Sequence, residues 1–107
     1  MIITNLDTLP GFRIDTHYGL VVGSIVETRH LVSHLQALWH KIWGGEVHGY
    51  SKLLEDVHTE ALQRLKEKAH YAGANAVLNI RFATSEIGDG AAELIAYGTA
   101  VRVIADA

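Results

Sequence analysis

The sequence contains no cysteine and only one proline, and it has no long run of basic or apolar residues. Without cysteine the chain cannot form disulfides, use a thiolate nucleophile or build a cysteine-based zinc site. No apolar run reaches about 18 residues, so no membrane-spanning helix is predicted. The formal net charge is −3 and there is no basic tail, which argues against a nucleic-acid partner.

The rest of the composition is typical of a folded protein. The 107 residues are 49% hydrophobic and 20% charged, which suits one globular domain. The first twelve residues lack a basic segment and a long apolar core, so they do not predict a signal peptide. We therefore expect a single domain over residues 1–107, a cytoplasmic location, and no nucleic-acid or membrane partner.

A change of pattern within AGANAVLNIRF, residues 72–82, organises the rest of the chain. Before it, apolar residues recur every three or four positions, which predicts an amphipathic helix over residues 51–72. Gly73 stands where the helix should stop, because glycine adopts the left-handed cap conformation without a Cβ penalty. The apolar residues that follow predict a strand over residues 76–84.

The same patterns locate the other elements. Apolar runs bounded by turn formers predict strands, and an apolar stripe predicts a further helix. The strands are expected at residues 2–4, 12–16, 20–26 and 93–104, and the helix at residues 28–43. Gly23 lies inside a strand that is apolar on both faces, which suggests a bulge or a close backbone approach. We predict an α+β fold with a mainly antiparallel sheet of four to five strands, two helices on one face, and the order β-β-β-α-α-β-β.

The predicted helices are too few for the apolar surface of the predicted strands. At least three strands are apolar on both faces, and two helices can cover only one face of such a sheet. Large exposed apolar faces are rare on monomers. We therefore expect self-association through the second face, as a symmetric homo-oligomer.

Several short motifs, in order, resemble the YbjQ-like family, also called UPF0145 and labelled a heavy-metal-binding domain. They are Leu9-Pro10-Gly11, Gly19-Leu20-Val21-Val22-Gly23, Gly44-Gly45, Tyr50, Gly73-Ala74-Asn75-Ala76-Val77 and Gly98-Thr99-Ala100-Val101. The resemblance covers nearly the whole chain. It implies an antiparallel sheet with helices on one side and ring-like homo-oligomers, with pentamers expected. It implies no established activity.

Seven histidines are the most unusual feature of the composition. His30 and His34 are four residues apart on one face of the predicted helix at residues 28–43, a spacing that can place both imidazoles on one metal ion. A usable site needs a third ligand, which a symmetry-related chain could supply. The alternative is a solvated helix face that carries two titratable side chains.

Asp15 and His17 form a second candidate pair. Residues two apart in a regular strand point to the same face, so the carboxylate could orient the imidazole as a general base. The alternative is an exposed strand end, because no partnered nucleophile is apparent. No residue is therefore assigned a catalytic role.

These patterns favour a binding module over an enzyme. The leading hypothesis is a homo-oligomer that binds a metal ion or a small molecule at its subunit interfaces, with a divalent metal ion as the candidate cofactor. One alternative is a small hydrolase-type enzyme that uses Asp15 and His17, or histidines from different subunits. Another alternative is a purely structural assembly. No cofactor-binding residue beyond His30 and His34 is assigned.

Overall fold

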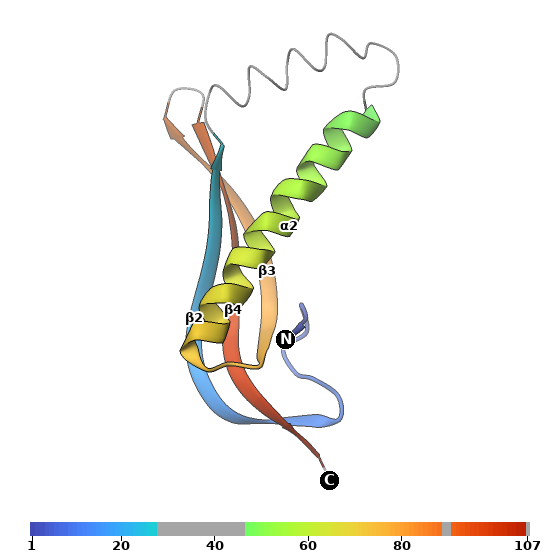
Figure 1. Cartoon of the computed structure of the whole chain (residues 1–107), viewed down its shortest axis with the longest axis vertical. Helices are drawn as coiled ribbons and strands as arrows, with labels where there is room; N and C mark the ends of the chain where they lie inside the picture. The colour runs from blue at the N-terminus through green and yellow to red at the C-terminus, as the bar shows by residue number, and fades with distance from the viewer. Residues whose placement is uncertain (28–46, 89–90, 107) are drawn as a thin grey trace.

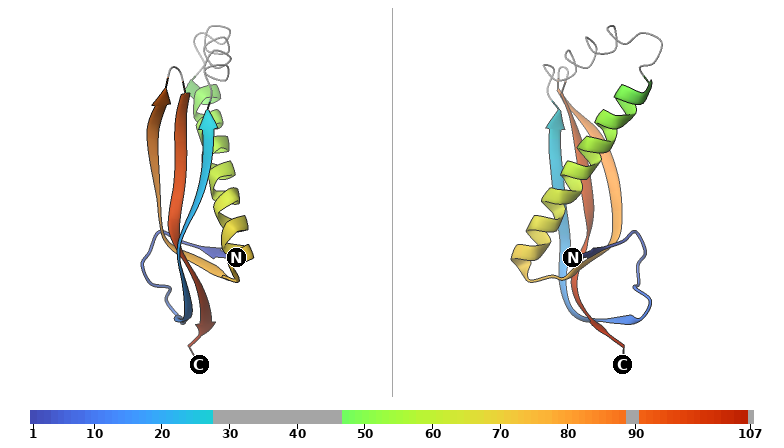
Figure 2. Two further views of the ribbon diagram at one scale, coloured as in Figure 1. Left: turned by 90° about the vertical axis from the view of Figure 1, so that its left-hand side faces the viewer. Right: turned by 45° about the vertical axis from the view of Figure 1, so that its right-hand side comes forward.

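The computed structural model describes residues 1–27, 47–88 and 91–106 of the chain. Within these ranges the elements are β1 (Ile2–Ile3), β2 (Phe12–Glu27), α2 (Val47–Ala72), β3 (Ala76–Gly88) and β4 (Ala91–Ala105). The strands form one sheet in the order β1-β3-β4-β2, and α2 runs diagonally across one face of it (Figures 1 and 2). None of the helical residues described here forms a segment long and apolar enough to cross a membrane.

Helix α2 is held to the sheet by a stripe of residues spaced four apart. Ala61, Leu65 and Ala69 are fully buried, and Val57 packs against the same cluster. This spacing places the four side chains on one side of a helix, where their burial favours packing against an apolar surface. The helix predicted from residue 51 therefore exists, although it begins earlier, at Val47.

The end of α2 is a complete Schellman motif, and the helix stop predicted at Gly73 is confirmed. Gly73 has a φ of 100°, in the left-handed region that glycine adopts most easily. Its N–H donates to the carbonyl of His70 at 3.0 Å, and the Ala74 N–H donates to the carbonyl of Ala69, also at 3.0 Å. Ala69 and Ala74 both belong to the buried core, which is the apolar contact that accompanies this motif.

Strand β2 corrects the prediction of two separate strands at residues 12–16 and 20–26. It is continuous from Phe12 to Glu27 and pairs antiparallel with β4 along its length. Irregularities between Ile14 and Thr16 and between His17 and Gly19 absorb extra residues, and Gly19 has a φ of 97°. The gap predicted between these two strands, at residues 17–19, is therefore a bulge, because β4 continues to supply backbone partners.

Strand β1 corrects the prediction of an antiparallel sheet. It pairs parallel with β3, with Ile2 opposite Ala76, so the sheet is mixed. The backbone of Thr4 and Leu6 continues this association, because the Ile80 N–H donates to the Thr4 carbonyl and the Asn79 N–H to the Leu6 carbonyl. A two-residue strand carries too little pattern to specify its partner, and a parallel partner is distant in sequence.

The predicted architecture is wrong in two further respects. The described residues contain one helix, in the order β1-β2-α2-β3-β4, and not two helices on one face of the sheet. The helix predicted at residues 28–43 lies outside the described residues. The strands predicted at residues 76–84 and 93–104 are also too short at their facing ends, because β3 and β4 remain paired up to Gly88 and Ala91.

The close contact between α2 and β2 occurs at Gly23, where the sequence suggested a bulge or a close backbone approach. A Cβ atom at Gly23 would collide with the carbonyl oxygen of Ala61 and the amide nitrogen of Leu65, and it would lie 2.9 Å from the Leu65 Cα. Only a residue without a side chain lets the helix backbone approach the strand this closely. The helix therefore lies mainly over β2 and β4, and less over β3.

The molecule is long and thin. Its principal axes measure 56 × 29 × 18 Å, and its radius of gyration of 17.0 Å exceeds the value of about 13 Å expected for a compact domain of this length. A thin molecule buries a smaller share of its apolar side chains in its own core. This shape leaves much of the sheet surface uncovered by the described elements.

Candidate functional site

The metal-binding residues predicted from the sequence, His30 and His34, lie outside the described residues, so this site stays a prediction. Four other histidines lie in the described ranges, one of them His48 in the first turn of α2, and the three whose surroundings are described are dispersed. His58 packs against Phe82, His70 lies beside Tyr71, and His17 is on β2. Within the described ranges, no three histidine, aspartate or glutamate side chains come together in a group that could hold a metal ion.

The geometry around Asp15 and His17 does not favour a catalytic pair. The irregularity between Ile14 and Thr16 interrupts the alternation of β2, so residues two apart no longer share a face there. The Asp15 carboxylate accepts a hydrogen bond from the hydroxyl of Thr16 at 3.1 Å. Both Asp15 and His17 are exposed. The reason for expecting one to orient the other is therefore lost.

The most distinctive surface is the side of the sheet that points away from α2, called here the open face. On β2, Val21 and Gly23 face the helix, so alternation turns their neighbours to the other side. Directly paired residues share a face, which extends the set across β4 and β3. The open face comprises Leu20, Val22, Ser24, Val26, Ala83, Ile95, Tyr97 and Thr99. Arg81 pairs with Tyr97, but its Nη1 donates to the carbonyl of Asn5, so its side chain turns toward the N-terminal segment beside β3.

The open face leaves large apolar side chains in contact with solvent. Leu20 is 74% exposed, Val26 is 48% exposed and Tyr97 is 36% exposed. Toward the other end of the same side, Val101 and Val103 are buried, where Leu9 of the N-terminal segment packs against their cluster. The described elements thus cover one end of this side of the sheet and leave the other end open.

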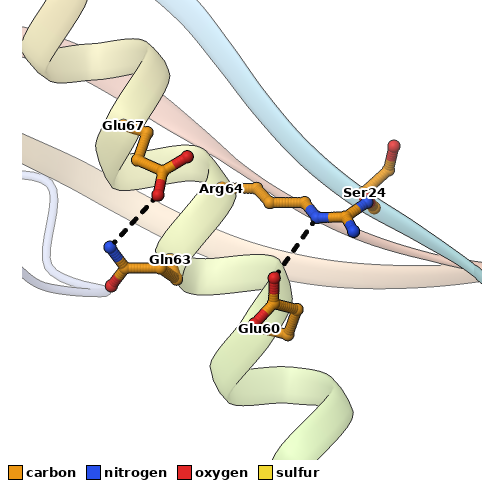
Figure 3. A network of polar contacts seen from close by, with 5 residues as sticks. All are labelled: Ser24, Glu60, Gln63, Arg64 and Glu67. Carbon is orange, nitrogen blue, oxygen red and sulfur yellow. Dashed lines mark hydrogen bonds and ion pairs between the residues drawn. The ribbon is translucent and has the colours of Figure 1, made fainter.

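Strand β2 lies at the edge of the sheet. The Arg64 side chain extends from α2 to Ser24 of β2, and Figure 3 marks its ion pair with Glu60. Nη1 of Arg64 donates to the carbonyl oxygen of Ser24 at 2.8 Å, and Nε lies 3.5 Å from a carboxylate oxygen of Glu60. Unpaired strand edges invite pairing with other chains, and charged side chains at an edge oppose it. The open face is therefore better suited to association than this part of the edge.

Sequence reasoning did not single out Arg81 or the surface around it. A lone arginine within a strand pattern has no spacing that marks it, and its bonds are to backbone groups distant in sequence. Nη1 of Arg81 donates to the carbonyl oxygens of Asn5 and Ile80, both at 2.9 Å. The parallel pairing of β1 with β3 brings the N-terminal segment beside Arg81, and that pairing was not predicted.

The chain matches known proteins over nearly its whole length. A family model described as "Putative heavy-metal-binding" matches residues 1–104. A UPF0145 protein of Hahella chejuensis is 54% identical over 101 residues, which are 94% of this chain and 97% of that protein. A UPF0145 protein of Pyrococcus furiosus is 46% identical over 103 residues, which are 96% of this chain and 90% of that protein.

A solved structure supports the fold. It is a protein of unknown function from Pediococcus pentosaceus that is assigned to the DUF74 family. The TM-score is 0.61 at 17% identity, and the match covers 97% of this chain and 98% of the other chain. At this identity the likeness concerns the fold alone.

Proposed function

The chain belongs to the YbjQ-like family, UPF0145, and from this premise we propose that it is a homo-oligomeric binding module that assembles through the open face. The exposed side chains of Leu20, Val26 and Tyr97 are the observation that carries the proposal. Burial of an aliphatic side chain of this size contributes about 1.5–3 kcal/mol, so association would stabilise several neighbouring residues together. The proposed assembly is a ring, with a mass of about five times the 11.7 kDa chain.

The proposed ligand site lies between subunits. His30 and His34 would contribute two imidazoles to a divalent metal ion, and a neighbouring chain would contribute the third ligand. Metal ions of this class are commonly held by three or four protein ligands, which a single pair of histidines does not provide. A symmetric assembly repeats each side chain around its axis and so offers additional ligands without additional sequence.

Assembly is tested by measuring mass in solution with light scattering. The Leu20→Lys/Tyr97→Lys variant should fall to the mass of one chain, because two charges would then need to be buried at the interface. Tyr71→Lys is the matched control, since Tyr71 is 89% exposed but lies on α2. A native chain that remains monomeric at every concentration tested would disprove the proposed assembly.

Metal binding is tested on protein purified without a histidine tag. The His30→Ala/His34→Ala variant should lose the bound metal, measured by elemental analysis after equilibration with zinc and dialysis. The control variant His17→Ala/His70→Ala also removes two imidazoles, from described positions that belong to no group able to hold a metal ion. It should retain the bound metal. Native protein that retains less than one metal ion per assembly would refute the metal site and favour a purely structural assembly.

A further inference from the structure

A groove lies on the helix side of the sheet, where α2 leaves β3 and β1 uncovered. Its volume is about 420 Å³, within the range of small-molecule sites. Its lining includes Leu62 of α2, Ile3 and Asn5 of the N-terminal segment, and Ile80 and Phe82 of β3. Arg81 also lines the groove, and it is the one charged residue among the described residues that do so.

The apolar part of the groove includes an aromatic ring held in place. Phe82 is 42% exposed, and its ring meets the ring of His58 in an edge-to-face arrangement with centroids 4.8 Å apart. Ile80 is buried beneath the surface, and Leu62 packs against the same core. A ligand with an apolar body would therefore replace water over a surface that is already positioned.

The polar part of the groove is a guanidinium held in a fixed orientation. Both hydrogens of Arg81 Nη1 are used by the carbonyl groups of Asn5 and Ile80. The Nε and Nη2 hydrogens have no acceptor among the described residues, and these are the donors that a carboxylate accepts as a parallel pair. In the described part of the chain the one ion pair is Arg64–Glu60, so no described carboxylate neutralises Arg81.

We propose that this groove binds a small organic carboxylate with an apolar body, of the size of an arylalkanoate. The carboxylate accepts hydrogen bonds from Nε and Nη2 of Arg81, and the apolar body lies against Phe82, Ile80 and Leu62. The site is formed within one subunit. It therefore requires neither the metal site nor a second subunit, although Arg81 lies beside Tyr97 of the open face.

Phenylpropionate is a suitable probe, and its neutral amide is the matched control ligand. Titration of phenylpropionate should shift the methyl NMR signals of Ile3, Leu62 and Ile80 in a saturable manner and leave those of Ile14 and Leu20 unchanged. By calorimetry the amide should bind at least about tenfold more weakly, because a hydrogen bond to a charged group contributes more than a neutral one.

Arg81→Gln should weaken phenylpropionate binding by about tenfold or more and leave binding of the amide unchanged. Arg102→Gln is the matched control, since Arg102 also donates from Nη1 to a backbone carbonyl, that of Gly73 at 3.2 Å, but lies outside the groove. If Arg81→Gln fails to fold, the comparison of the two ligands on the native protein still decides the question.

Three results would overturn the proposal. They are equal affinity for acid and amide, the absence of saturable shifts in the groove methyl groups, and groove signals that respond to protein concentration instead of ligand. The last result would mean that a second copy of the chain occupies the groove. Light scattering on the same samples separates the two proposals, because a monomeric chain that binds phenylpropionate refutes the assembly only.

Discussion

On the helix side of the sheet Leu65 is fully buried, whereas on the open face Leu20 leaves 74% of its surface in solvent. Both leucines belong to apolar patterns that predict burial, and neither pattern is stronger than the other. The difference is that α2 approaches β2 closely at Gly23, while no described element covers Leu20. An apolar pattern therefore indicates that a residue favours burial, and the tertiary arrangement determines whether the same chain provides the cover.

The largest expected effect comes from separating α2 from the sheet. Gly23→Val should destabilise the protein by about 4 kcal/mol or more, because its Cβ would collide with the backbone of Ala61 and Leu65 and no change of rotamer relieves a backbone clash. The free energy of unfolding in urea measures this. Ser24→Val is the control on the opposite side of the same strand and should change stability by less than about 0.5 kcal/mol. Equal losses for the two variants would contradict the close contact.

The two leucines themselves provide the next comparison. Leu65→Ala should cost about 2–5 kcal/mol of unfolding free energy, because it leaves a cavity in the core. Leu20→Ala, measured at a dilution at which light scattering shows single chains, should cost less than about 0.5 kcal/mol. A larger cost for Leu20→Ala in that dilute sample would mean that the open face is covered within the chain.

A smaller effect is expected where the side chain of Asn75 joins β3 to β4. Its Nδ2 donates to the carbonyl of Val103 at 2.9 Å, and its Oδ1 accepts from the Val103 N–H at 2.8 Å. Asn75→Ala should cost about 1–3 kcal/mol, because both backbone groups of Val103 lose a partner in a partly buried position. Asn79→Gly is the control and should remain within about 0.5 kcal/mol, since Asn79 has a φ of 55° that glycine also adopts. Loss of stability in the control alone would contradict this assignment.

The smallest change in unfolding free energy is expected at the solvent-exposed contact between Arg64 and the edge strand β2. Arg64→Gln should cost no more than about 1 kcal/mol, because both members of its ion pair with Glu60 are about half exposed, at 50% and 55%. Lys68→Gln, on the exposed side of the same helix, should have no measurable effect. The free energies of unfolding of the two variants are compared by urea denaturation at low and high salt. A loss above about 2 kcal/mol for Arg64→Gln would mean that its hydrogen bond to Ser24 contributes more than expected.

Features that depend on neighbouring residues were predictable from the sequence. The Schellman motif at Gly73 forms from residues close in the chain, and its glycine gave a direct signal. The close approach at Gly23 was among the predicted alternatives, although its partners Ala61 and Leu65 are distant in sequence and were not predicted. The parallel pairing of Ile2 with Ala76 was not predictable, because it joins residues far apart in sequence through backbone groups that every residue carries.

Some features of the candidate sites were likewise predictable from the sequence, and others were not. The open face follows from strands that are apolar on both sides, and this pattern was visible in the sequence. The failure of the Asp15 and His17 pair follows from an irregularity near Ile14, which depends on how β2 must align with β4. The groove at Arg81 depends on the path of the N-terminal segment and had no counterpart in the sequence patterns.

The sequence by itself determined where α2 ends, which residues favour burial, and that a sheet of this kind carries apolar side chains on both faces. Only the tertiary structure decided that α2 covers the side of Val21 and Gly23, that β1 pairs with β3, and that Leu20 is left in solvent. The physical reason is that the hydrophobic effect depends on the area removed from water and not on direction. A local pattern therefore specifies how strongly a surface favours burial, whereas the geometry of the whole chain selects what buries it.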